Sequence, residues 1–300
     1  MIQGLKGELV KTITSDGLEL VGFFTDKKSD IAVFHSHGTA GDFYTHKFIE
    51  TEAEKLSSLG ISFLTANNRG HDVYADIRKY KKGKIEWAQI GGGFERFEDC
   101  LYDIKGWLDF LSVRGVKKVI LQGHSLSQKI LYYQHVKREK RVVGQIHLSP
   151  QNDAGLMYYA LGKKEYEATS KKVAKMVKEG RGNKLLPKKL SPVSYATSNL
   201  MYFGYLTEEG RGTLTPYHNP NSPNWNIISE VKEPMLIIFG SEDTFMKPSV
   251  EFAAKIIKLK TKNTPDTTVE IIRGATHSYI GYENKLTDTI QKWITKRFHL

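Results

Sequence analysis

Short apolar runs alternate with longer segments of helical periodicity along most of this chain. Residues 31–34 are continuously hydrophobic, which is typical of a strand covered by helices on both faces. Further strands are predicted at residues 62–66, 118–122, 142–148, 234–240 and 268–272, and helices at 46–59, 94–111, 126–138, 249–258 and 284–296. Residues 8–26 predict a hairpin with its turn at 15–17. Strands separated by helices indicate an α/β fold with a mostly parallel sheet.

The alternation stops at Ser149-Pro150 and resumes only at the strand that begins near Pro234. Roughly eighty residues are too many for a plain loop. Tyr166, Thr169 and Val173 recur at helical spacing within this stretch. We therefore predict a largely helical lid at residues 151–230, inserted into one α/β core domain formed by residues 1–150 and 231–300.

A serine lies at a predicted turn between a strand and a helix. Ser125 occupies the centre of Gly123-His124-Ser125-Leu126-Ser127. A hydroxyl at the tip of such a turn is held clear of the sheet, and the backbone N–H groups that open the helix can receive an oxyanion. This placement predicts a nucleophile.

A serine nucleophile needs a base that a carboxylate orients. Asp243 and His277 each follow a predicted strand, so we expect both at the carboxyl edge of the sheet, near Ser125. Glu242 competes with Asp243 for the role of the acid, and Asp153, which follows an earlier strand, is a weaker alternative.

A glycine-rich turn, residues 35–41, follows the first buried strand. There the backbone can approach the nucleophile closely, so the N–H groups of Thr39 and Leu126 are predicted to form the oxyanion hole. His37 is expected to shape this turn. A metal site built from His35, His37 and His71 lacks any recognised ligand spacing, and no metal or other cofactor is expected.

The pair His37-Gly38, the turn around Ser125, Asp243 and His277 together resemble the α/β-hydrolase superfamily, in which serine, acid and histidine follow in this order. The resemblance implies the α/β-hydrolase fold, a mostly parallel twisted sheet flanked by helices with an inserted helical lid. Residues 94–107, with the turn and Leu148-Ser149-Pro150, are similar to a group that includes siderophore ester hydrolases and serine-dependent macrolide esterases. Ser127 stands where the family usually has glycine. Because serine is larger than glycine, we expect the turn to be slightly shifted and the enzyme to be active.

These observations predict a serine hydrolase that cleaves a carboxylic ester or lactone through an acyl-enzyme. The lid is rich in aromatic residues and methionine, which suits a bulky, partly apolar natural product such as a macrolide or a siderophore. Thioesterase, peptidase and carbon–carbon bond hydrolase activities use the same triad and stay open. A ligand-binding protein of the same fold, with little turnover, is a further alternative. The predicted substrate-binding residues are His37, Gly38, Met157, Tyr202 and Phe203, and the other lid residues noted are Tyr158, Tyr159, Tyr195, Met201 and Tyr205.

The distribution of charge bears on the partners that the protein can have. The chain has 44 Lys and Arg residues against 33 Asp and Glu, a net charge of +11 that by itself permits a nucleic acid or membrane partner. Ten basic and four acidic residues fall within 151–190, which we interpret as a solvated helix face, with steering of an acidic substrate as the alternative. We expect a small-molecule substrate, no nucleic acid and no membrane partner, while a homodimer stays open.

The first eight residues lack the apolar core of a secretory signal, and the run at 235–239 is too short to cross a bilayer, so a cytoplasmic location is expected. The single cysteine, Cys100, excludes an internal disulfide and is expected in the core.

Overall fold

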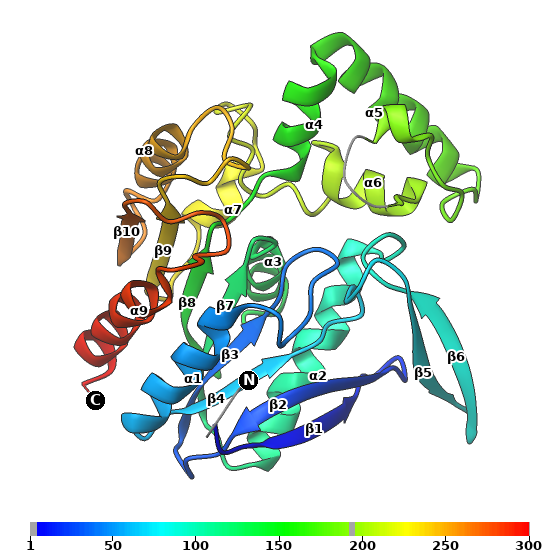
Figure 1. Ribbon diagram of the computed structural model, residues 1–300. Coiled ribbons are helices and arrows are strands. Elements are labelled where there is room, and N and C mark those ends of the chain that lie inside the picture. The colour runs from blue at the N-terminus through cyan, green and yellow to red at the C-terminus, as the bar shows by residue number, and fades with distance from the viewer. Residues whose placement is uncertain (1–4, 192–195, 300) are drawn as a thin grey trace.

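The computed structural model describes residues 5–191 and 196–299, so Tyr195 lies outside the described residues. An eight-stranded sheet runs through the molecule in the order β1-β2-β4-β3-β7-β8-β9-β10 (Figure 1). β1 and β2 pair antiparallel, as do β2 and β4, and all the remaining pairs are parallel, which confirms the predicted sheet. The strands are β1 (Glu8–Ile13), β2 (Glu19–Thr25), β3 (Ile31–Ser36), β4 (Ser62–Ala66), β7 (Lys118–His124), β8 (Val142–Leu148), β9 (Met235–Gly240) and β10 (Thr267–Ile272).

Helices cover both faces of the sheet. On one face lie α1 (Lys47–Ser58) and α9 (Glu283–Phe298), and on the other α2 (Cys100–Val113), α3 (Gln128–Lys137) and α8 (Val250–Lys260). Side chains alternate between the faces of a strand, so Leu236 and Ile238 of β9 pack with α9 while Ile237 and Phe239 pack with α8. This two-sided burial explains why the strand is continuously hydrophobic.

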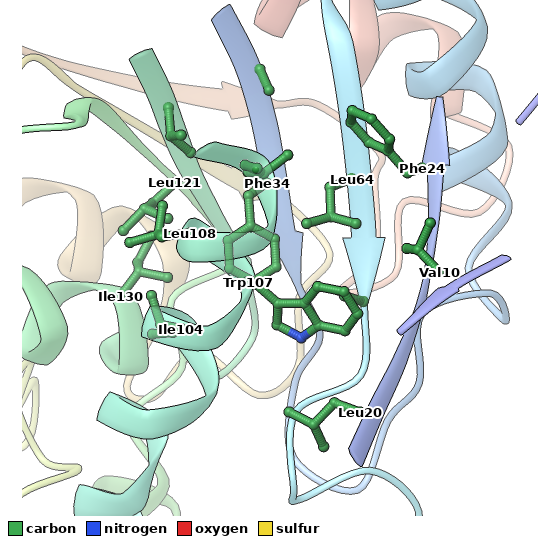
Figure 2. Packing of buried hydrophobic residues seen from close by; sticks show 14 of the residues in the cluster. Val10, Leu20, Phe24, Phe34, Leu64, Ile104, Trp107, Leu108, Leu121 and Ile130 are labelled. Carbon is green, nitrogen blue, oxygen red and sulfur yellow. The ribbon is translucent and has the colours of Figure 1, made fainter. Parts of the chain in front are cut away.

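Trp107 of α2 anchors one of these layers. Figure 2 shows its ring between the helix and the sheet, near Phe34 of β3 and Leu64 of β4. The indole N–H donates to the carbonyl of Asn67 at 3.0 Å, so the one polar atom of this fully buried side chain is satisfied. Cys100, at the start of the same helix, is buried as expected.

A hairpin of β5 (Ala75–Lys81) and β6 (Lys84–Ile90) stands beside the main sheet and was not predicted (Figure 1). Its sequence is rich in charged residues, and Ile85 and Trp87 are exposed, so no buried face imposes a clear period. The turn at Lys82-Gly83, where both residues have positive φ, was the available signal.

Residues 151–230 contain helices α4 (Asp153–Leu161), α5 (Lys163–Lys178), α6 (Asn199–Leu206) and α7 (Trp225–Ser229), with a short 3-10 turn at Lys188–Leu190. The first three pack on one another around Tyr166 and Met201, set apart from the sheet (Figure 1). The chain then returns to the core, because Trp225 and Ile228 of α7 pack with Leu131 of α3. The division into a core and a lid stays a prediction.

Candidate active site

Ser125 occupies a strained turn between β7 and α3. Its φ is 61°, in the left-handed region that non-glycine residues seldom adopt. Two backbone hydrogen bonds hold the turn: the Ser125 N–H donates to the Leu148 carbonyl at 2.8 Å, and the Gln151 N–H donates to the Ser125 carbonyl at 2.9 Å. A Cβ on Gly123 would lie 2.7 Å from the Ser127 Cα, so only glycine allows this close approach. The fold therefore presents the hydroxyl as the motif indicates.

Asp243 and His277 form a pair on the loops after β9 and β10. The imidazole Nδ1 lies 2.7 Å from Asp243 Oδ2, and because a carboxylate accepts, Nδ1 carries the proton and donates it. This tautomer leaves Nε2 of His277 free to act as a base. Asp243 is buried, whereas Glu242 is exposed and accepts a hydrogen bond from the neighbouring Ser241 hydroxyl, so the geometry favours Asp243 as the acid.

His124, the residue before the serine, ties the histidine loop to the turn. Its Nε2–H donates to the backbone carbonyl of His277 at 2.8 Å, and the two rings lie with their centroids 5.0 Å apart. Burial holds the pKa of His124 well below its usual value, so the ring is neutral at pH 7. Sequence reasoning gave His124 no role, although its position within the motif was a signal.

The loop after β3 approaches the serine closely. A Cβ on Gly38 would lie 2.8 Å from Ser125 Cβ, so this position requires glycine. His37 shapes the loop: its Nε2 accepts from the Asn68 N–H, and its Nδ1–H donates to the Gly38 carbonyl at 2.8 Å. Among the described residues, the N–H groups of Thr39 and Leu126 donate to no acceptor, and their role as an oxyanion hole stays a prediction.

Ser125 and His277 both line one pocket of about 620 Å³, a volume typical of small-molecule sites. Within the described part of the chain, the hydrogen bond of the Ser125 hydroxyl goes to Gln151 Oε1 at 3.3 Å, and none joins it to His277. Catalytic hydrogen bonds are often long or misaligned until substrate binds. Gln151 was not predicted, and its place directly after the Ser149-Pro150 strand end was the available signal.

The predicted substrate-binding residues divide between the pocket and its surroundings. Gly38 and Met157 line the pocket, whereas His37, Tyr202 and Phe203 do not. Tyr202 is fully buried among the helices of residues 151–206, and both ring nitrogens of His37 are used within its loop. Residues that line the pocket without having been predicted to bind substrate include His46, Asp153, Leu156, Tyr159, Phe245 and Lys247.

Ser127, which stands where the family usually has glycine, packs inside the core beside β8. Its hydroxyl lies 3.0 Å from Nδ1 of His147 on β8, and both side chains are buried. Burial lowers the pKa of His147 to about 3, so this ring is neutral. The serine thus serves as a partner for a buried imidazole.

The three histidines considered as metal ligands, His35, His37 and His71, each have a polar partner within the protein. His35 Nδ1 lies 3.0 Å from Gln122 Nε2, and His71 Nδ1 lies 2.7 Å from Asp72. Within residues 5–191 and 196–299, no three His, Cys, Asp or Glu side chains are placed to hold a metal ion. No helix in those ranges is both long and apolar enough to cross a membrane.

The strand order and the flanking helices are those of the α/β-hydrolase fold, and solved structures of that fold superpose on nearly the whole chain. The siderophore hydrolase EstB from Aspergillus fumigatus is 17% identical with a TM-score of 0.67, covering 98% of each chain. Est1E from Butyrivibrio proteoclasticus with bound ferulic acid is 15% identical with a TM-score of 0.65, covering 96% of this chain and 99% of that chain. The esterase Pf2001 from Pyrococcus furiosus is 17% identical with a TM-score of 0.60, covering 97% and 91%. These similarities confirm the predicted α/β-hydrolase fold.

The chain belongs to the family described as "Protein of unknown function (DUF1749)", whose model matches residues 90–299. That range includes Ser125, Asp243 and His277. A comparison with curated protein sequences gave no match.

Proposed function

We propose that this protein is a serine hydrolase that cleaves carboxylic esters or lactones through an acyl-enzyme. The observation that carries the proposal is that Ser125, on its strained turn, and His277 line one pocket, while Asp243 is hydrogen-bonded to His277. The names of the similar structures agree with this activity, since EstB is described as a siderophore hydrolase and Pf2001 as an esterase.

The reaction would begin when the Ser125 hydroxyl turns from Gln151 toward Nε2 of His277. His277 takes the hydroxyl proton as the oxygen attacks the substrate carbonyl, and Asp243 stabilises the imidazolium that forms. The N–H groups of Thr39 and Leu126 bind the oxyanion, and His277 then protonates the departing alcohol. Water activated by His277 finally releases the acyl group and restores Ser125.

The wall of the pocket favours a bulky, partly apolar substrate. Leu156, Met157 and Tyr159 contribute from α4, and Phe245 contributes beside His277, with the two ring centroids 4.8 Å apart. We propose a large natural-product ester or macrolactone as the substrate class. We further propose a cytoplasmic protein that acts on a small molecule and needs no cofactor, nucleic acid or membrane.

A hydrolysis screen tests the proposal. Wild-type protein is assayed on aryl esters, thioesters, anilides, lactones and macrolides, with Ser125→Ala as the matched control. We expect turnover of esters or lactones that falls at least about a thousandfold in Ser125→Ala. Preferred turnover of thioesters or anilides would point to the thioesterase or peptidase alternatives. Equal rates in the two proteins, or no turnover of any substrate, would refute the proposal.

A further inference from the structure

Asp153 places a carboxylate in the wall of the catalytic pocket, where the proposed chemistry does not use it. It is the first residue of α4, whose N-cap is Asn152, and it lines the pocket together with Ser125 and His277. The acid of the triad is Asp243, which already accepts from His277. Asp153 therefore does not serve as the acid that orients His277, which is the role considered for it in the sequence analysis.

One amide group separates Asp153 from the nucleophile. The Ser125 hydroxyl donates to Gln151 Oε1, and Gln151 Nε2 donates to Asp153 Oδ1. Across the described residues, the second oxygen, Oδ2, has no hydrogen-bond partner, and it is not sealed from solvent. Asp153 thus has one oxygen fixed by the protein and one open to a bound molecule.

Asp153 also lacks an ion-pair partner within the described residues; the groups of basic character that share its pocket are His277, whose charge acts against the rise in the pKa of Asp153, and Lys247. The carboxylates of Glu95 and Asp103 are matched by the buried cations Lys129 and Arg69. By contrast, no Lys, Arg or His side chain in the described ranges forms an ion pair with Asp153. A partly buried carboxylate without an ion-pair partner carries a desolvation penalty that a cationic ligand would relieve. Burial raises the pKa of Asp153 from 3.8 to about 6, so above pH 7 the group is largely ionised.

The apolar residues around Asp153 limit the shape of such a ligand. Leu156, Met157 and Phe245 line the same pocket, so an ammonium group would reach Asp153 on an apolar or aromatic body. We infer that Asp153 is a specificity-determining residue that selects ester substrates carrying a primary ammonium group a few bonds from the scissile carbonyl. This inference rests on the proposed hydrolase function and narrows its substrate class.

Matched substrate pairs test the inference at pH 8. One pair varies the acyl side, 4-nitrophenyl 4-(aminomethyl)benzoate against 4-nitrophenyl 4-methylbenzoate, and the other the alcohol side, 4-(aminomethyl)benzyl acetate against 4-methylbenzyl acetate. The variant is Asp153→Asn, which keeps an oxygen for Gln151 Nε2. The control is Glu165→Gln, which removes a carboxylate of the same charge from an exposed position that does not line the pocket.

We expect wild-type kcat/KM to favour the cationic member of at least one pair. Asp153→Asn should reduce that preference about tenfold or more, mainly through KM, while the neutral member changes little. Glu165→Gln should leave the preference as in wild type. The inference is refuted if wild type shows no cationic preference in either pair, if Asp153→Asn leaves the preference unchanged, or if it slows both members equally.

A binding measurement keeps this test independent of turnover. In Ser125→Ala protein, NMR titration compares benzylamine with benzyl alcohol, and the same titration is repeated with Asp153→Asn added. We expect benzylamine to bind more tightly than the alcohol, and this advantage to disappear in the double variant. Equal binding of the two probes would overturn the role of Asp153 even if ester hydrolysis is established. If benzylamine binds more tightly and Asp153→Asn removes this advantage, but the wild-type protein hydrolyses no ester, only the proposed function is refuted.

Discussion

Gly38 gives the sharpest test of how the loop after β3 and the nucleophile fit together. A Cβ at this position would lie 2.8 Å from Ser125 Cβ, 3.1 Å from the His124 carbonyl oxygen and 3.4 Å from the Ser125 hydroxyl. Carbon atoms in contact prefer separations of about 3.5–4.0 Å, so in Gly38→Ala the loop or the serine must move by roughly 1 Å. Both the nucleophile and the Thr39 N–H would be displaced.

Misplacement by about 1 Å can cost a hundredfold in rate, and the loss of one oxyanion donor about 10²–10³-fold. We therefore expect kcat/KM for 4-nitrophenyl butyrate to fall by about 10²–10³-fold in Gly38→Ala, a loss of roughly 3–4 kcal/mol in transition-state stabilisation.

The matched control is Gly106→Ala in α2, where the new methyl group would lie 3.5 Å from the nearest Thr12 atom, an ordinary contact, and away from the pocket. Its kcat/KM should stay within about threefold of wild type, because nothing near the nucleophile moves. Thermal unfolding followed by circular dichroism verifies that both variants fold. A folded Gly38→Ala protein with more than a third of wild-type activity would refute the close approach of this loop to Ser125.

Three further predictions concern Asp243, Asp153 and Ser127. Asp243→Asn should lower kcat by about 10⁴-fold, because the amide favours the wrong His277 tautomer; steady-state kinetics showing a loss below tenfold would contradict this. Asp153 binds its proton more tightly in the folded chain, so wild-type stability falls as pH rises from 3.8 to about 6. Urea titrations of Asp153→Asn and of wild type give the free energy of unfolding of each protein at pH 3.5 and 7.5. The value for the variant minus the value for wild type should rise by up to about 3 kcal/mol over this range. A difference that does not change with pH would contradict the raised pKa of Asp153. Ser127→Ala should cost about 1–3 kcal/mol by leaving His147 Nδ1 unpaired, while kcat/KM stays within about threefold; unchanged stability would contradict the role given to this hydroxyl.

The sequence could predict the frame of the site because each of its parts follows a buried strand. Continuous apolar runs mark strands covered on both faces, and a motif directly after such a run lies at the carboxyl edge of the sheet. Ser125, Asp243 and His277 all satisfied that condition: Ser125 and His277 line one pocket, and Asp243 lies behind His277, to which it is hydrogen-bonded. Asp243 and Glu242 are neighbours in the sequence, and the structure supplies a physical reason to prefer Asp243 in the exposure of Glu242.

Other features depend on packing that periodicity does not encode. Tyr202 and Phe203 had the composition of a pocket wall, but Tyr202 is fully buried and neither residue lines the pocket. The return of residues 207–230 to the core depends on Trp225 meeting α3 and α8, a long-range contact without a local signal. Gln151 acts through a hydrogen bond that forms only once β7 and β8 lie side by side.

A fluorophosphonate probe measures most directly whether Ser125 is an activated nucleophile. After incubation and tryptic digestion, mass spectrometry should find one adduct, on the peptide of residues 119–129, with fragmentation placing it on Ser125 and not on Ser127. The adduct should vanish in Ser125→Ala and form far more slowly in His277→Ala. A folded wild-type protein that gains no adduct, or gains it at another residue, would contradict the account.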